Sequence, residues 1–177
     1  MLTLSDIGMR DLVWRYPETE DGAFELSADE ARLGWLRFDE RAGAPSVAEL
    51  AGQTWSFQHV GGALPHVKIC KGNSPDAVAE FAPRLTGGGV VSFASGSSYC
   101  WNRAKIWSPT WCFRRQGEGQ GSSVCVSQQA GPLRDGGRVK ICGKAAGLPE
   151  APVLVLLAWY LRVLAFEMLA DSVPGTG

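Results

Sequence analysis

The sequence predicts a single mainly-β domain in which many antiparallel strands wrap around one apolar C-terminal helix. Three observations predict this fold class. The 22 Gly and 10 Pro are scattered along the chain, so they supply the many turns that short strands require. Between Arg10 and Ile141 the apolar residues come in short runs that Gly, Pro, Asp or Ser interrupt. Residues 151–170 then form one long apolar run.

Length and composition are those of a globular protein. The 177 residues suit one domain covering 1–177, and a hydrophobic fraction of 45% is too high for a disordered chain. The net charge of −1 gives no long-range attraction to nucleic acid, so we expect no nucleic-acid partner. The N-terminus shows no basic stretch followed by an apolar one, so we expect a cytoplasmic protein, with peripheral association at a membrane left open.

The strands are expected within residues 11–143, and several show the period of two that a half-buried strand requires. In the third, Trp35 and Arg37 face one way while Leu36 and Phe38 face the other. Asp76–Pro83 is assigned to neither a strand nor a helix. The predicted strands are, in order, Asp11–Tyr16, Ala23–Leu26, Arg32–Asp39, Ser46–Ala51, Thr54–His59, His66–Lys71, Val90–Ser95, Ser98–Trp101, Ala104–Trp107, Thr110–Arg115, Ser123–Gln128 and Arg138–Gly143.

A tetrapeptide repeat predicts two similar halves. Val67–Cys70 recurs letter for letter as Val139–Cys142, 72 positions later. Each copy follows a Trp-led strand, 35–39 or 111–115, then a Gly-containing turn and another short strand. The Gly-rich link 86–89 lies between the copies, so we expect two β-modules that close one sheet.

The last apolar run predicts a helix over residues 149–171. Pro149 and Glu150 suit a helix start, and Asp171 and Pro174 suit its end. Twenty helical residues span roughly 30 Å, the thickness of a bilayer core or of a small domain. Arg162 and Glu167 lie inside the run, where a membrane would penalise their charges, so we expect a buried core helix. A membrane-inserted tail and an oligomer interface are the alternatives.

Segments along most of the chain resemble a known superfamily. They are Gly96–Trp101, Trp111–Phe113, the turn Gln116–Gly119, the strand Val139–Ile141 and the helix Leu154–Leu161. Between about Trp14 and Leu169 the chain resembles the tubby C-terminal-like superfamily of tubby proteins, phospholipid scramblases and LURP-one-related proteins. The resemblance implies a closed antiparallel barrel of about twelve strands around the helix, and binding of phosphoinositide headgroups or membranes. No headgroup motif, calcium loop or cysteine-rich palmitoylation cluster of that superfamily is matched.

Charge is distributed unevenly along the chain. Residues 1–83 carry thirteen acidic residues against seven Lys and Arg, whereas 84–144 carry nine Lys and Arg against Glu118 and Asp135 alone. We expect an anion site in the basic segment, because guanidinium and ammonium groups bind phosphate and carboxylate oxygens. A solvated outer barrel face is the alternative. The candidate residues, with Arg103 and Lys105 on one strand face, are Arg103, Lys105, Arg114, Arg115, Arg138 and Lys140.

Other side chains give weaker signals. Trp101, Trp107 and Trp111 interleave with these cations, as in a membrane interface or in ordinary core packing. His66 and Cys70 alternate on one strand but offer two ligands where zinc needs three, so no metal and no other cofactor is expected. The five cysteines, an odd number without a C-x-x-C pair, indicate reduced thiols.

The sequence therefore predicts a non-enzymatic binding or scaffold module for an anionic headgroup of phosphoinositide type or another anion. The alternative is a protein-interaction module of a bacterial system, which would use exposed Trp side chains or strand edges. A small hydrolase that uses Cys with His59 or His66 is the third hypothesis, although no acid or Asn is placed to orient the histidine.

Overall fold

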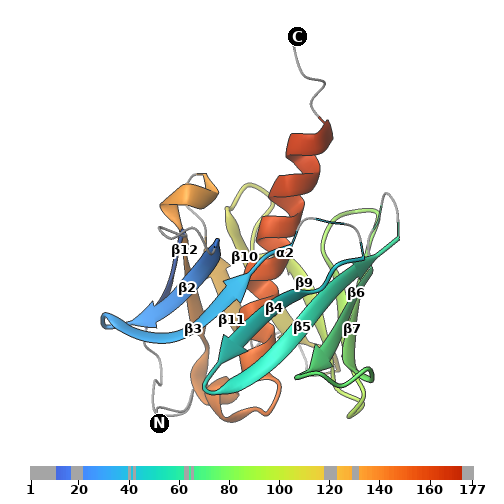
Figure 1. The fold of residues 1–177 in the computed structure, drawn as a ribbon, viewed down its shortest axis with the longest axis horizontal. Helices are drawn as coiled ribbons and strands as arrows, with labels where there is room; N and C mark the ends of the chain where they lie inside the picture. Colours follow the sequence, from blue (N-terminus) through green and yellow to red (C-terminus); the bar gives the residue numbers. More distant parts are fainter. Residues whose placement is uncertain are drawn as a thin grey trace.

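A computed structural model describes residues 11–16, 22–39, 41, 43–61, 64, 66–117, 123–128 and 132–172. They form twelve strands, two short 3₁₀ helices and one long α-helix (Figure 1). The elements are β1 (Asp11–Arg15), β2 (Ala23–Ala28), β3 (Ala31–Arg37), β4 (Ser46–Leu50), β5 (Gln53–Val60), β6 (His66–Lys71), β7 (Ala77–Pro83), β8 (Gly89–Phe93), β9 (Ser98–Arg103), β10 (Thr110–Arg115), β11 (Ser123–Gln128), η1 (Leu133–Asp135), β12 (Gly137–Ile141), η2 (Gly143–Gly147) and α2 (Ala151–Ser172).

The strands form a closed antiparallel barrel. Each strand pairs with its neighbours in the chain, and β12 returns to pair with β1 from Asp11 opposite Lys140 to Trp14 opposite Gly137. Closure leaves no unpaired edge among the described strands. The predicted closed barrel around a C-terminal helix is confirmed.

One strand prediction was wrong, and one strand lies in the stretch that the sequence left unassigned, so the number of strands is unchanged. Residues 104–107 form a turn between β9 and β10, where the Ser108 N–H donates to the Lys105 carbonyl oxygen at 3.0 Å. The prediction failed because Ile106 and Trp107 are apolar, as strand residues often are, although both are exposed here. The unassigned stretch 76–83 contains β7, because its Ala79 and Phe81 alternate with exposed residues.

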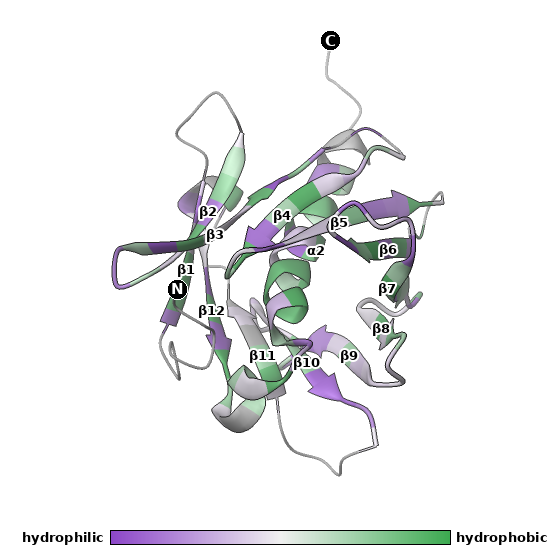
Figure 2. Ribbon diagram, turned by 60° about the horizontal axis from the view of Figure 1, so that its bottom comes forward, coloured by the Kyte–Doolittle hydropathy of each residue, from purple (hydrophilic) through white to green (hydrophobic). Residues whose placement is uncertain are grey.

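Helix α2 fills the barrel. Every residue from Ala151 to Leu164 is buried except Pro152 and Arg162, which are half-buried. Figure 2 shows this apolar helix inside the ring of strands. Trp159 stacks on Trp14 with ring centroids 5.6 Å apart. Because strands surround the helix on all sides, the helix can be apolar all round and needs no polar face. Each fully buried Leu or Val side chain contributes roughly 1.5–3 kcal/mol to the free energy of folding.

Beyond Leu164 the helix leaves the barrel (Figure 1). The stretch Ala151–Leu169 is long and apolar enough to cross a membrane by length and composition, yet most of it is enclosed by the strands. A core helix passes the same test. The prediction of a buried core helix therefore holds for Ala151–Leu164.

The two copies of the tetrapeptide and the two Trp-led strands are not separated by the same number of strands. Its copies lie on β6 and β12, six strands apart and so on opposite walls of the barrel. Trp35 and Trp111 lie on β3 and β10, which are seven strands apart. Residues 86–88 of the Gly-rich link belong to the turn between the paired strands β7 and β8, and Gly89 begins β8.

The antiparallel order gives the barrel two different ends. The connections that follow β1, β3, β5, β7, β9 and β11 lie at the end where α2 emerges, which we call the helix-exit end. At the opposite end the helix begins, and the Ser97 hydroxyl donates to the Glu150 carboxylate at 2.6 Å. This contact ties the helix start to the turn between β8 and β9.

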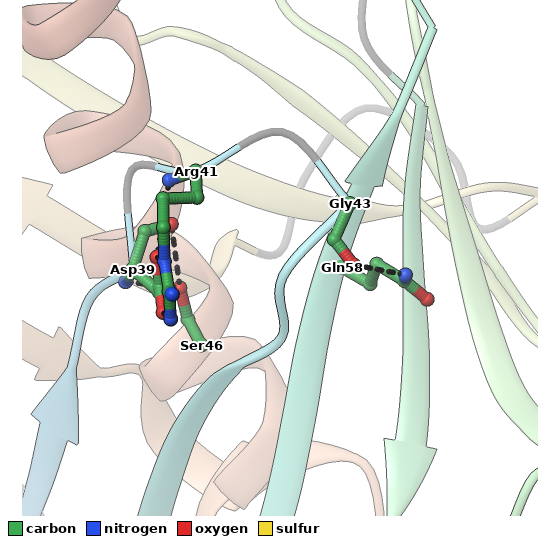
Figure 3. A network of polar contacts seen from close by, with 5 residues as sticks. All are labelled: Asp39, Arg41, Gly43, Ser46 and Gln58. Carbon is green, nitrogen blue, oxygen red and sulfur yellow. Dashed lines mark hydrogen bonds and ion pairs between the residues drawn. The ribbon is translucent and has the colours of Figure 1, made fainter.

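A polar network holds the β3–β4 connection at the helix-exit end (Figure 3). The Arg41 side chain donates two hydrogen bonds to the Asp39 carboxylate, at 2.6 and 2.9 Å. The Asp39 N–H donates to the Ser46 hydroxyl at 2.8 Å, and the Gln58 amide donates to the Gly43 carbonyl oxygen. Hydrogen bonding from the Arg41 side chain, followed by that from its backbone, lowers the pKa of Asp39 to about 2.

Candidate functional site

The structure distributes the six predicted cations over three places. All six side chains are exposed. Arg114, Arg138 and Lys140 lie on the outer face of the wall, because they alternate with the buried residues Phe113, Val139 and Ile141. Lys140 lies opposite Asp11 in the register of the β1–β12 pair. The six residues therefore do not converge on one groove.

The other three cations lie at the two ends of the barrel. Arg115 ends β10 at the end where the helix begins, across from Tyr99. Arg103 ends β9 at the helix-exit end, and Lys105 follows in the turn. The expected shared strand face of Arg103 and Lys105 was wrong, because the strand stops at Arg103. The Arg103 guanidinium instead donates to the Ile106 carbonyl oxygen at 3.2 Å.

Exposed apolar side chains gather at the helix-exit end. Every large apolar residue that is exposed among the described residues belongs to this end, in a connection, at the last residue of β5 or on the end of α2. Isolated exposed apolar residues are normal, whereas their concentration on one surface indicates an interaction site. The residues are Tyr16, Val60, Leu64, Leu85, Ile106, Trp107, Phe166, Met168 and Leu169.

The most exposed of them lie on two adjacent hairpins. Leu85, in the β7–β8 turn, is 90% exposed, and Ile106 and Trp107, in the β9–β10 turn, are 77% and 94% exposed. Because β8 pairs with β9, the two turns are neighbours at the rim of the barrel. We call Leu85, Ile106 and Trp107 the apolar tip.

Cations accompany the apolar tip. Arg84 precedes Leu85, and Arg103 and Lys105 precede Ile106. The Arg84 guanidinium reaches the outer wall, where one of its nitrogens lies 3.9 Å from the Cys100 sulfur. Exposed apolar side chains and positive charge thus share the rim above β7–β10.

A pocket of about 160 Å³ lies just inside this rim, between α2 and the strands β7–β10. Its walls are mostly apolar, and Arg162 is the one charged residue among the described residues that line it. Gly88 has φ of +71°, and a Cβ there would lie 2.1 Å from the Trp101 carbonyl oxygen, so only glycine lets the turn approach this closely. The lining residues are Phe81, Pro83, Gly88, Trp101, Trp111, Leu161, Arg162, Leu164, Ala165 and Met168.

Two guanidinium groups lie near one indole ring at the pocket. The guanidinium carbons of Arg103 and Arg162 lie 5.4 and 6.0 Å from the ring centroid of Trp111. Burial, and then the positive charge of Arg103, lower the pKa of Arg162. Trp111 in turn stacks on Trp101 at 5.4 Å. This arrangement combines an apolar cavity with two like charges.

Sequence reasoning missed Arg162 as a site residue, because it served there only as an argument against a membrane span. The available signal was a lone cation in the part of the helix that the barrel encloses. Of the three interleaved tryptophans, Trp101 is buried, Trp111 is half-buried at the pocket and Trp107 is exposed.

Histidine and cysteine side chains form no comparable site in the described part of the chain. His59 Nδ1 lies 3.5 Å from the Tyr160 hydroxyl, and the Cys70 thiol lies 3.9 Å from the Pro75 carbonyl oxygen. Burial raises the pKa of the Cys125 thiol, which disfavours the nucleophilic thiolate. No group of three or more potential metal ligands occurs among the described residues.

Comparison with protein families, with curated proteins and with solved structures finds no match to this chain.

Proposed function

We propose that this domain is a non-enzymatic binding module that docks reversibly on anionic membranes through the rim above β7–β10. The observation that carries the proposal is the apolar tip with its adjacent cations at one end of the barrel. The resemblance to the tubby-like superfamily supports it, since that resemblance implies lipid binding by a barrel of this kind.

The chemistry of the rim suits a bilayer interface. Tryptophan prefers the headgroup region, and removing a large apolar side chain from water contributes up to roughly 1.5–3 kcal/mol. Each Lys or Arg near an anionic surface adds about 1 kcal/mol. Three apolar tip residues and three cations therefore suit peripheral, salt-sensitive binding, while α2 stays in the barrel.

A protein partner is the competing occupant. The closed barrel offers it no strand edge among the described strands, so it would have to use the same rim. The charge at the rim favours the membrane, because the cations that flank Leu85 and Ile106 match an anionic surface.

Vesicle flotation tests the proposal. We expect the full chain to float with vesicles that contain phosphatidylserine in phosphatidylcholine, and to bind pure phosphatidylcholine much less. Combining Leu85→Ser, Ile106→Ser and Trp107→Ser should reduce the bound fraction at least tenfold, because the inserted side chains are lost. The matched control combines Tyr16→Ser, Val60→Ser and Leu64→Ser, which are exposed at the same end but outside β7–β10.

Charge is tested with a second matched pair. Replacing Lys105 with Gln should weaken binding severalfold, whereas Lys140→Gln, on the outer wall, should have little effect. Equal losses from the two substitutions, or no binding to anionic vesicles by correctly folded protein, would overturn the proposal. The proposal would also be overturned if the protein bound one protein partner through the rim and bound no vesicles.

A further inference from the structure

We propose that the pocket between α2 and β7–β10 binds one single-chain anionic amphiphile, with its alkyl chain against the apolar walls and its carboxylate or phosphate between Arg103 and Arg162. This inference goes beyond membrane docking, because side chains of the domain itself line the pocket and binding there needs no bilayer.

The cavity has the size and surface for an alkyl segment. Its volume of about 160 Å³ is several times the roughly 30 Å³ of one water molecule, and its walls offer water few hydrogen-bond partners. Apolar cavities of roughly 150 Å³ in other proteins stay dry and accept a molecule of benzene size. Met168 lines the pocket and is partly exposed, so a longer chain can continue outward along the helix.

Packed aromatic walls keep the cavity from collapsing. Trp101 contacts both Trp111 and Phe113, with ring centroids 5.4 and 4.5 Å away. Gly88 also lines the pocket, and it lets the β7–β8 turn lie against the backbone of Trp101. Preformed walls lower the entropic cost of binding.

The two arginines select an anionic head. Arg103 and Arg162 share the Trp111 ring, and the charge of one opposes the charge of the other. No acidic side chain lines the pocket among the described residues. An anion placed between the guanidinium groups relieves their repulsion and accepts charge-assisted hydrogen bonds from both. A neutral amphiphile would contact only the apolar walls, and an anion without an alkyl chain would contact only the two arginines.

Titration calorimetry with monomeric probes below their micelle concentration tests the inference. Decanoate and decyl phosphate represent the two sources of the anion, a fatty acid and a phospholipid. We expect at least one of them to bind, and we expect decanol, acetate and inorganic phosphate to bind at least tenfold more weakly. The stronger of the two anionic probes identifies the head group.

Variants locate the binding. Arg162→Met keeps the aliphatic stem and removes the charge, so affinity for the anionic probe should fall at least tenfold. Ala165→Phe, at an exposed position on the pocket wall, fills the cavity without disturbing the core and should abolish binding. Arg114→Met on the outer wall is the matched control and should bind as the native protein does.

Unchanged affinity in folded Ala165→Phe, or decanol binding as tightly as the anionic probes, would overturn the inference. The apolar-tip variant separates the two proposals. It should lose vesicle binding yet keep amphiphile binding, whereas Ala165→Phe should lose the amphiphile whether or not it still floats with vesicles.

Discussion

At the scale of single residues, position on the barrel decides what an arginine does. Arg138 alternates with buried residues and lies on the outer wall, whereas Arg103 ends a strand and reaches the rim. Arg162 lies on the core helix yet reaches the same indole as Arg103. The alternation of a strand shows which side a residue faces, but not which neighbours it has in space.

Asp39 gives a pH prediction at this scale. Its pKa is about 2 in the folded protein because Arg41 donates to it, against an ordinary value of 3.8. A depressed pKa means that the contact stabilises the fold above about pH 4, and that this contribution is lost as the pH falls toward 2. We expect a carboxyl-carbon NMR titration to show Asp39 with a midpoint near 2.

Arg41→Met should raise the midpoint of Asp39 part of the way to its ordinary value, because the backbone N–H of residue 41 still donates to the carboxylate, and it should leave the barrel folded, because the network lies on the surface. A native midpoint near 4 would show that the contact is absent in solution.

At the scale of elements, α2 has two parts with different surroundings. Ala151–Leu164 is enclosed by the strands, while Ala165, Phe166, Met168 and Leu169 are exposed beyond the rim. The sequence of the helix is apolar in both parts, so composition alone does not reveal where the barrel ends.

Matched substitutions in the helix test this division. Leu157 is fully buried, so Leu157→Asp places an unpaired charge in the core, which costs several kcal/mol against a total stability of about 5–15 kcal/mol. We expect loss of the cooperative thermal transition by circular dichroism. Leu169→Asp, where the side chain is 68% exposed, should melt within a few degrees of the native protein. Similar melting of the two variants would contradict the buried core helix.

The sequence was sufficient for most elements, because alternation marks strands that have one buried face. It failed at 104–107, where exposed Ile106 and Trp107 resemble a strand, and it left β7 unassigned. The candidate site was predicted less well. Lys105 and Arg103 were named, but the pocket depends on Arg162 meeting Trp111 from a distant segment, and no local pattern encodes such a contact.

At the scale of the whole molecule, the two ends of the barrel differ in chemistry. The exposed large apolar residues of the described chain lie at the helix-exit end, while the other end holds the start of the helix through Ser97 and Glu150. The cations of the basic segment are spread over both ends and the outer wall. A membrane-facing role for the whole domain therefore rests on the rim above β7–β10, where the apolar tip, the cations and the pocket adjoin.

Quenching of tryptophan fluorescence by brominated lipids in anionic vesicles tests this claim most directly. Trp107 is 94% exposed, while Trp14, Trp55, Trp101 and Trp159 are buried. We predict that brominated vesicles quench the native protein and that Trp107→Phe, which keeps vesicle binding, loses most of that quenching. Bound native protein without quenching, or quenching that Trp107→Phe leaves unchanged, would contradict the account.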